Sequence, residues 1–199
     1  MLCSLLIYTF NRPEYLNRNL QYLKKINFYF NIYILDSSND NNFEKNNDNI
    51  KKLNLKIHHI KFNERISPSI KILTALERIN TKYVLICPDD DFISLNGLKK
   101  CINFLENNLE YSVVHGNYYN YYPPGNNLTF LSKFSWKNRY DSSLIDDNST
   151  YIRFKKYFDN YNTPLLYSLY RTPFLLKTFR KISKCITFQN GEWMQAMIT

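Results

Sequence analysis

The stretch LCSLLIYTFNRPE, residues 2–14, indicates the fold class because it reads as a strand, a tight turn and the start of a helix. A short run of mainly apolar residues is typical of a strand buried on both faces of a parallel sheet. Asn11 or Arg12 can occupy the N-cap of the following helix, and Pro13 is tolerated in its first turn. Glu14 stands three residues after Asn11, as in a capping box.

The same alternation of strand and helix continues over the first 120 residues. Further strands are predicted over residues 31–35, 55–60, 83–87 and 112–115, and helices over residues 69–79 and 96–106. Residues 39–49, almost all Asn, Asp, Lys and Glu, are predicted to form a polar loop. The alternation predicts an α/β fold of Rossmann-like type, with a mostly parallel central sheet flanked by helices.

Beyond residue 120 the pattern becomes irregular. Residues 151–184 are predicted to form basic helical pieces that Pro164 and Pro173 interrupt. We therefore divide the chain into a core over residues 1–120 and an irregular C-terminal region over residues 121–199.

Composition places the 199-residue chain among globular proteins, with 44% hydrophobic and 22% charged residues. No apolar run reaches the roughly 18 residues that a membrane-spanning helix needs, and the N-terminus lacks the basic start of a signal peptide. The four cysteines lie far apart without a C-x-x-C pair, so a zinc site is not expected. Free cysteines of this kind indicate a reducing compartment, so we expect a cytoplasmic protein.

The formal net charge is +9. Residues 151–184 hold eight basic residues against one acid, Asp159, with Tyr and Phe interleaved. This asymmetry predicts an anionic partner, such as the inner membrane surface or a glycolipid acceptor, although a solvated basic face would look the same. A nucleic-acid partner is not expected, because no RNA-binding motif is present and the acidic run described next would repel phosphate.

Three predicted strands end in polar or acidic residues. In open α/β sheets the ligand crevice lies at the carboxyl ends of the strands, so we expect these groups to converge. The three groups are Thr9-Phe10-Asn11, Asp36-Ser37-Ser38 and Asp89-Asp90-Asp91.

The three adjacent aspartates at 89–91 repel one another unless a cation offsets their charge. Carboxylate oxygens suit Mg²⁺ or Mn²⁺, which also take oxygens from a diphosphate. In an extended backbone Asp89 and Asp91 would point to one side and share the metal, while Asp90 faces away. The alternative is a solvated acidic turn that caps the next helix.

The other strand ends offer candidates for nucleotide binding. Asp36, with Ser38 beside it, can accept hydrogen bonds from a base or ribose, or it can simply form an Asx turn. Thr9, Asn11 and Arg12 can line the pocket, with Arg12 near phosphate, although helix capping is an equally simple role.

Lys71 and Arg65 flank the start of the predicted helix over residues 69–79. A helix N-terminus and a cation there both favour phosphate, so Lys71 is a further candidate for nucleotide binding. A solvated basic face explains the two residues equally well.

Four elements in this order resemble the family-two glycosyltransferases of the GT-A fold, which use nucleotide-diphospho-sugar donors and invert the anomeric centre. The resemblance covers residues 1–120, and its elements are Thr9-Phe10-Asn11-Arg12-Pro13, Leu35-Asp36-Ser37-Ser38, Cys87-Pro88-Asp89-Asp90-Asp91 and His115-Gly116. Pro88 departs from the family pattern. The metal can therefore be bound either by the pair Asp89 and Asp91 or by Asp90.

The resemblance implies an enzyme of cell-surface polysaccharide biosynthesis, with a divalent metal, Mn²⁺ or Mg²⁺, and a glycan or glycolipid acceptor. It makes residues 1–120 the nucleotide-sugar-binding core and residues 121–199 the acceptor-side region. It also implies an acidic general base at the head of a later helix, and Glu192 is the candidate. The rivals of Glu192 are Asp146, Asp147 and Asp159. The family usually continues beyond that helix, so we expect a short or truncated member.

Three alternatives remain open from the residues. The chain can be a catalytically degenerate or nucleotide-binding relative, or a basic nucleic-acid-binding domain. A nucleotidyltransferase is disfavoured, because such enzymes need a Gly-rich first loop and residues 9–14 contain no glycine.

Overall fold

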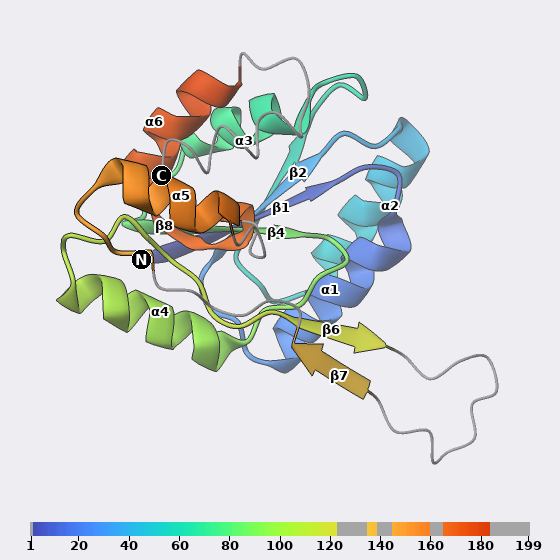
Figure 1. Cartoon of the computed structure of the whole chain (residues 1–199). Helices are drawn as coiled ribbons and strands as arrows, with labels where there is room; N and C mark the ends of the chain where they lie inside the picture. Colours follow the sequence, from blue (N-terminus) through green and yellow to red (C-terminus); the bar gives the residue numbers. More distant parts are fainter. Residues whose placement is uncertain (1, 123–134, 139–144, 160–164, 184–199) are drawn as a thin grey trace. The chain divides into compact units, whose positions relative to one another are not determined.

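A computed structural model of the chain describes residues 2–122, 135–138, 145–159 and 165–183 (Figure 1). The chain divides into two compact units, one formed by Met1–His115 with Leu165–Thr199 and the other by Gly116–Pro164. The assignment of residues 121–199 to the acceptor side stays a prediction, and β8 and α6 of that region belong to the first unit.

The described part of the first unit is an α/β fold, as predicted. Its strands are β1 (Cys3–Thr9), β2 (Asn31–Asp36), β3 (Ile57–Lys61), β4 (Tyr83–Pro88), β5 (Val113–Val114) and β8 (Leu169–Arg171). Its helices are α1 (Pro13–Lys25), α2 (Asp40–Lys51), α3 (Pro68–Leu76), α4 (Leu95–Asn107) and α6 (Thr172–Ile182), with a 3₁₀ turn η1 (Leu165–Tyr167).

The central sheet has the strand order β3-β2-β1-β4-β8-β5. β1 pairs in parallel with β2 and β4, and β2 pairs in parallel with β3, whereas β8 runs antiparallel to β4 and β5. In this register Thr9 lies opposite Asp36, and Tyr8 lies opposite Pro88. The three polar strand ends therefore meet at one edge of the sheet, which confirms the expected convergence.

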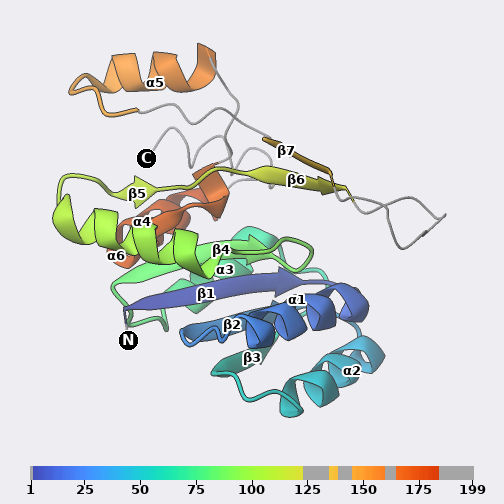
Figure 2. The same ribbon diagram turned by 90° about the horizontal axis from the view of Figure 1, so that it is seen from below.

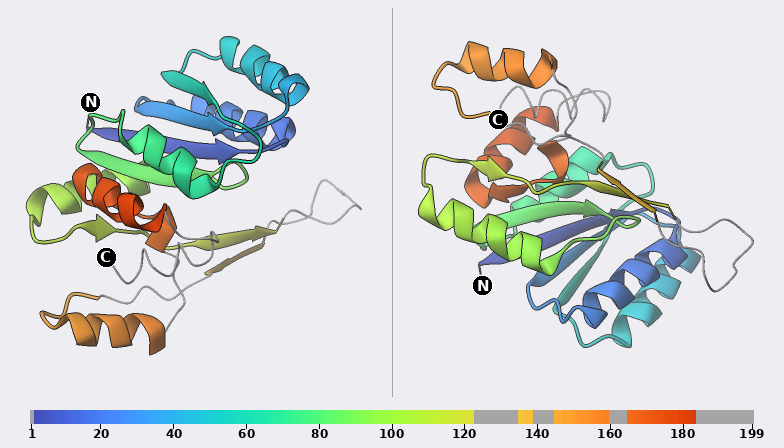
Figure 3. Two further views of the ribbon diagram at one scale, coloured as in Figure 1. Left: turned by 90° about the horizontal axis from the view of Figure 1, so that it is seen from above. Right: turned by 60° about the horizontal axis from the view of Figure 1, so that its bottom comes forward.

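Helices cover both faces of this sheet, as Figures 2 and 3 show. Leu5 and Ile7 of β1 pack with apolar residues of α1 and α4, whereas Leu6 packs on the other face with α3 and α6. Successive strand side chains point to opposite faces, so an almost continuously apolar strand is what a sheet with two covered faces requires.

The polar loop predicted over residues 39–49 is wrong, because the segment forms α2. Asn39 caps this helix, since its side chain accepts a hydrogen bond from the backbone N–H of Asn42 at 2.9 Å. Asn46 is buried, Ile50 packs partly buried against the apolar cluster around β1, and Phe43 stacks on His59, so these three residues mark the inner face at helical spacing. A polar residue in the middle of that face hid the amphipathic period from the sequence pattern.

The sequence pattern also missed β8, which lies between β4 and β5. A strand of three residues is too short to show a period, and its pairing partners are distant in the sequence. Pro173 does not interrupt a helix but lies in the first turn of α6, where its missing N–H costs nothing.

The second unit contains the antiparallel pair β6 (Tyr119–Tyr122) and β7 (Ser135–Asn138) and the helix α5 (Thr150–Asp159). The later helix that the resemblance implies, with Glu192 at its head, lies outside the described residues. Within the part of the chain that the structure describes, no helix has the length and apolar character needed to cross a bilayer.

Arg171 at the end of β8 ties this strand to α4. Its Nη2 donates to the carbonyl oxygens of Leu105 at 2.7 Å and Asn108 at 3.1 Å, and its Nε donates to that of Tyr111 at 2.8 Å. The Arg171 side chain thus satisfies carbonyl groups at the C-terminal end of α4, which have no partner within the helix.

We predict that Arg171→Met lowers the free energy of unfolding by about 2 kcal/mol, because several partly buried carbonyls lose a charged donor. Denaturant unfolding followed by circular dichroism measures the change. Arg180→Met is the matched control, since Arg180 is exposed and its contact with Glu77 is long, at 3.9 Å. Equal stabilities of the two variants would contradict this role for Arg171.

Candidate functional site

The ends of β1 and β4 are joined through the carboxylate of Asp89, which is fully buried. The Thr9 hydroxyl Oγ1 donates to Asp89 Oδ2 at 2.6 Å, and Arg12 Nη2 donates to Asp89 Oδ1. Both oxygens of this carboxylate therefore have a partner, which is what a buried charge requires. Sequence reasoning assigned all three residues to one donor-binding site, and the structure brings them into direct contact.

Arg12 also bridges to the next carboxylate, since its Nη1 donates to Asp90 Oδ2 at 3.0 Å. The expectation that Asp90 faces away from Asp89 is therefore wrong. β4 ends at Pro88 and Asp89-Asp90 form a turn, so the alternation of an extended strand no longer applies. The side chain of Asp91 is exposed.

Burial and the neighbouring charges act in opposite directions on this cluster. Burial raises the pKa of Asp89 above its ordinary value, although the Thr9 hydrogen bond and the charge of Arg12 act to lower it. Desolvation alone would lower the pKa of Arg12, but Asp89 and Asp90 outweigh it and raise that pKa. The guanidinium thus stays charged between the two aspartates.

Lys71 reaches the same edge of the sheet from α3 and is almost completely buried. Its Nζ donates to Ser37 Oγ at 2.9 Å and lies 3.4 Å from the carbonyl oxygen of Thr9. Burial lowers the pKa of Lys71 to about 8, although the charges of Asp36 and Asp89 act to raise it. The structure therefore places Lys71 beneath the strand ends, between two buried carboxylates, whereas Arg65 is exposed.

Asp36 at the end of β2 is also fully buried. Its Oδ1 accepts from the Ser38 N–H at 2.8 Å, and its Oδ2 accepts from Asn46 Nδ2 at 2.7 Å and lies 3.0 Å from His59 Nε2. Burial alone would raise the pKa of Asp36, but the hydrogen bonds from His59, Ser38 and Asn46 outweigh it and lower that pKa. An ionised carboxylate is thereby held at the strand end.

Asn11 connects the turn after β1 to the turn after β2. It adopts a left-handed backbone with φ of 53°, which Asn tolerates better than most residues. Its N–H donates to Ser38 Oγ at 2.8 Å, and its Oδ1 accepts from Asn39 N–H at 3.0 Å and Asn42 Nδ2 at 3.1 Å. The predicted capping box is wrong, because the N-cap of α1 is Arg12 and no side chain caps the helix.

Sequence reasoning missed three residues that hold this edge together: Asn19, Asn46 and His59. Asn19 Nδ2 donates to the carbonyl oxygen of Asp91 at 2.6 Å and fixes the acidic turn, residues 89–91, to α1. The available signal was an Asn on the apolar face of a helix, one turn from Leu16. Asn46 gave no such signal, because its helix was not predicted. His59 gave none either, because alternation marks only its face of the strand.

The proposed general base, Glu192, lies outside the described residues. Of its rivals, Asp159 pairs with Lys155 within α5, and Asp147 Oδ1 accepts from the N–H of Ser149 at 2.9 Å. Asp146 is exposed. All three belong to the second unit, so the choice of base stays a prediction.

The side chains of the acidic turn offer carboxylate oxygens, and these suit a hard divalent cation. Within the described residues, no group of three or more His, Cys, Asp or Glu side chains could hold a metal alone. Magnesium is commonly bound by one or two carboxylates together with substrate phosphates, so residues 89–91 suit an ion that arrives with a diphosphate. The assignment of Asp89 and Asp91 as its ligands stays a prediction.

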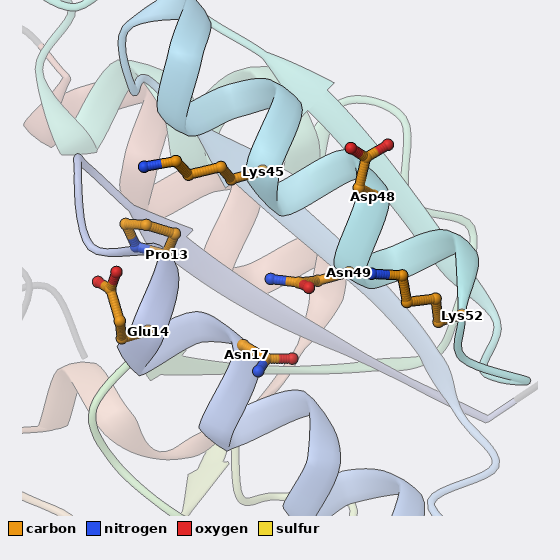
Figure 4. A pocket seen from close by; sticks show the side chains of 7 residues that line it. All are labelled: Pro13, Glu14, Asn17, Lys45, Asp48, Asn49 and Lys52. Carbon is orange, nitrogen blue, oxygen red and sulfur yellow. The ribbon is translucent and has the colours of Figure 1, made fainter.

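A separate cavity of about 300 Å³ lies between α1 and α2 (Figure 4). Charges of both signs line it, so it does not favour an anion. The lining residues are Pro13, Glu14, Asn17, Lys45, Asp48, Asn49 and Lys52. None of them is a predicted donor-binding residue, and the cavity is therefore distinct from the cluster around Asp89.

Comparison with solved structures supports the fold assignment. The chain resembles TarS 1-349 from S. aureus with a TM-score of 0.59 and 20% identity, over all of this chain and 55% of that one. Its complex with UDP gives 0.59 and 18% over 98% and 54% of the two chains, and its complex with UDP-GlcNAc gives 0.53 and 21% over 89% and 47%. The chain thus spans about half of these structures.

No curated protein sequence matches the chain. The family model described as glycosyl transferase family 2 matches residues 4–177, which include most of β1, the acidic turn and the first half of α6. Because this match extends over most of the chain and agrees with the fold, the protein belongs to glycosyl transferase family 2.

Proposed function

We propose that this protein transfers a sugar from a nucleotide-diphospho-sugar to a hydroxyl group of a glycan or glycolipid, with inversion at the anomeric carbon. The observation that carries the proposal is the edge of the sheet where Thr9, Asp36 and Asp89 lie at neighbouring strand ends. Ligands of open α/β sheets bind at such an edge. The TarS structures with UDP and UDP-GlcNAc support a nucleotide sugar as the donor.

The donor is proposed to lie across this edge, with its base and ribose toward β2 and its diphosphate toward the acidic turn. Lys71 and Arg12 bring positive charge to the diphosphate side, which offsets the carboxylates already present there. The residues assigned to donor binding are Thr9, Asn11, Arg12, Asp36, Ser38, Lys71, Asp89 and Asp90.

In the proposed transfer, the acceptor oxygen attacks the anomeric carbon while the bond from that carbon to the diphosphate breaks. Glu192 takes the proton of the acceptor hydroxyl as general base. A Mg²⁺ or Mn²⁺ ion held by Asp89 and Asp91 would supply neutralisation of the charge that develops on the departing diphosphate. Thr9 keeps the carboxylate of Asp89 in place during this step through its hydroxyl hydrogen bond.

A panel of nucleoside diphosphates and their sugars, tested with Mn²⁺ by thermal shift and calorimetry, examines donor binding. We expect a rise in melting temperature with at least one nucleotide sugar, because a ligand that binds only the folded state stabilises it.

Asp91→Asn should weaken the Mn²⁺-dependent affinity about tenfold. Asp48→Asn, an exposed change on α2, is the control, and equal affinities of the two variants would argue against a metal role for Asp91.

We predict that Glu192→Gln lowers the transfer rate about a thousandfold and leaves donor affinity unchanged, because only the proton acceptor is lost. Transfer is measured as release of nucleoside diphosphate in the presence of acceptor, and donor affinity by calorimetry. Asp159→Asn serves as the comparison. Retained transfer in the Glu192 variant, or loss of donor binding, would overturn the assignment.

The reaction is proposed to serve cell-surface polysaccharide synthesis in a bacterial cytoplasm, at the inner face of the membrane. The exposed side chains of α5 support this, since Tyr151, Phe154, Lys155 and Lys156 combine aromatic and basic groups. We predict sedimentation with vesicles that contain phosphatidylserine and none with neutral vesicles. Equal sedimentation with both, or none with either, would exclude this contact.

A further inference from the structure

Arg12 is the counter-ion of two adjacent carboxylates at the acidic turn. Its guanidinium donates through one nitrogen to Asp89 and through the other to Asp90. The Asp89 carboxylate is completely buried, whereas the side chains of Arg12 and Asp90 are 40% and 39% exposed. Solvent therefore reaches this bridge from the Arg12 and Asp90 side.

The other cation at this edge does not substitute for Arg12. The Lys71 ammonium bonds to Ser37 and lies close to backbone carbonyl oxygens at the ends of β1 and β2. Arg18 is exposed on α1, where its guanidinium lies over the rings of Tyr15 and Phe92. Among the residues that the structure describes, Arg12 is thus the side chain that pairs with both Asp89 and Asp90, and it lies partly in solvent.

We propose that Arg12 acts as a latch on the acidic turn: its guanidinium occupies oxygens of Asp89 and Asp90 until a diphosphate binds the guanidinium instead. Guanidinium binds phosphate and carboxylate with the same bidentate geometry, so a diphosphate competes directly for the donors that now hold Asp89 and Asp90. Release of Arg12 frees the carboxylate of Asp89, one of the two proposed metal ligands, for a divalent cation. The inference rests on the proposed function and adds an order of events, in which the donor opens the cation site.

This latch has a consequence that a simple phosphate-binding role for Arg12 lacks. Arg12 and a cation compete for the same oxygens, so removal of the guanidinium should strengthen cation binding in the absence of any nucleotide. A residue that only contacts phosphate would leave this affinity unchanged. By linkage, the donor should raise cation affinity more in the wild-type protein than in a variant without the latch.

Titration of the full chain with Mn²⁺ alone, followed by electron paramagnetic resonance of the free ion, tests the latch. Arg12→Gln should bind Mn²⁺ about tenfold more tightly than the wild-type protein. Arg18→Gln removes the same charge from a neighbouring site of α1 and should leave the affinity within about twofold of wild type. Equal affinities of the Arg12 variant and either the wild type or the Arg18 variant would overturn the latch.

Arg12→Lys is the second variant, should loss of the charge beside buried Asp89 prevent folding. A lysine ammonium keeps the charge but lacks the planar fork with which the guanidinium spans the two carboxylates, so an intermediate Mn²⁺ affinity is expected, and a wild-type value would contradict the latch. Repeating the titrations with each nucleoside diphosphate of the panel separates the two proposals. If the wild-type protein binds none of them, and no Mn²⁺ in their presence, the proposed function fails. If it binds one of them together with Mn²⁺ and the Arg12 variants match it, only the latch fails.

Discussion

The burial of the Asp89 carboxylate is the constraint on which the rest of the site depends. A charge removed from water is costly unless hydrogen bonds and a counter-charge compensate it, and Thr9 and Arg12 provide both. These two contacts tie the end of β1 and the start of α1 to the turn after β4. Lys71 supplies a second buried charge beneath the same strand ends. Hydrogen bonds and opposite charges therefore link the ends of β1, β2 and β4, and the three loops at this edge do not act independently.

Most of the first unit could be predicted from the sequence, because buried parallel strands appear as apolar runs and the main helices carry an apolar period. β1, β2, β3 and β4 were all predicted within a few residues. α2 could not be predicted, since Asn46 interrupts its inward face to serve Asp36. β8 was missed because pairing with distant strands stabilises it, and a three-residue segment shows no pattern of its own.

The location of the candidate site could be predicted, but the partners within it could not. Strand ends in a parallel sheet fall at one edge, so the convergence of Thr9, Asp36 and Asp89 follows from topology. Whether Arg12 faces phosphate or carboxylate depends on tertiary geometry that spacing does not encode. The alternation of side chains along a strand failed to predict the direction of Asp90 for a related reason, because β4 ends at Pro88, directly before the first aspartate.

The central claim is that a nucleoside diphosphate and its metal bind at the carboxyl edge of β1, β2 and β4. A crystal structure of the chain with UDP and Mn²⁺ tests it most directly. We expect density for the diphosphate and the ion beside residues 89–91, with the base toward Asp36. Density for the nucleotide in the cavity between α1 and α2, with the acidic turn still closed by Arg12, would contradict it.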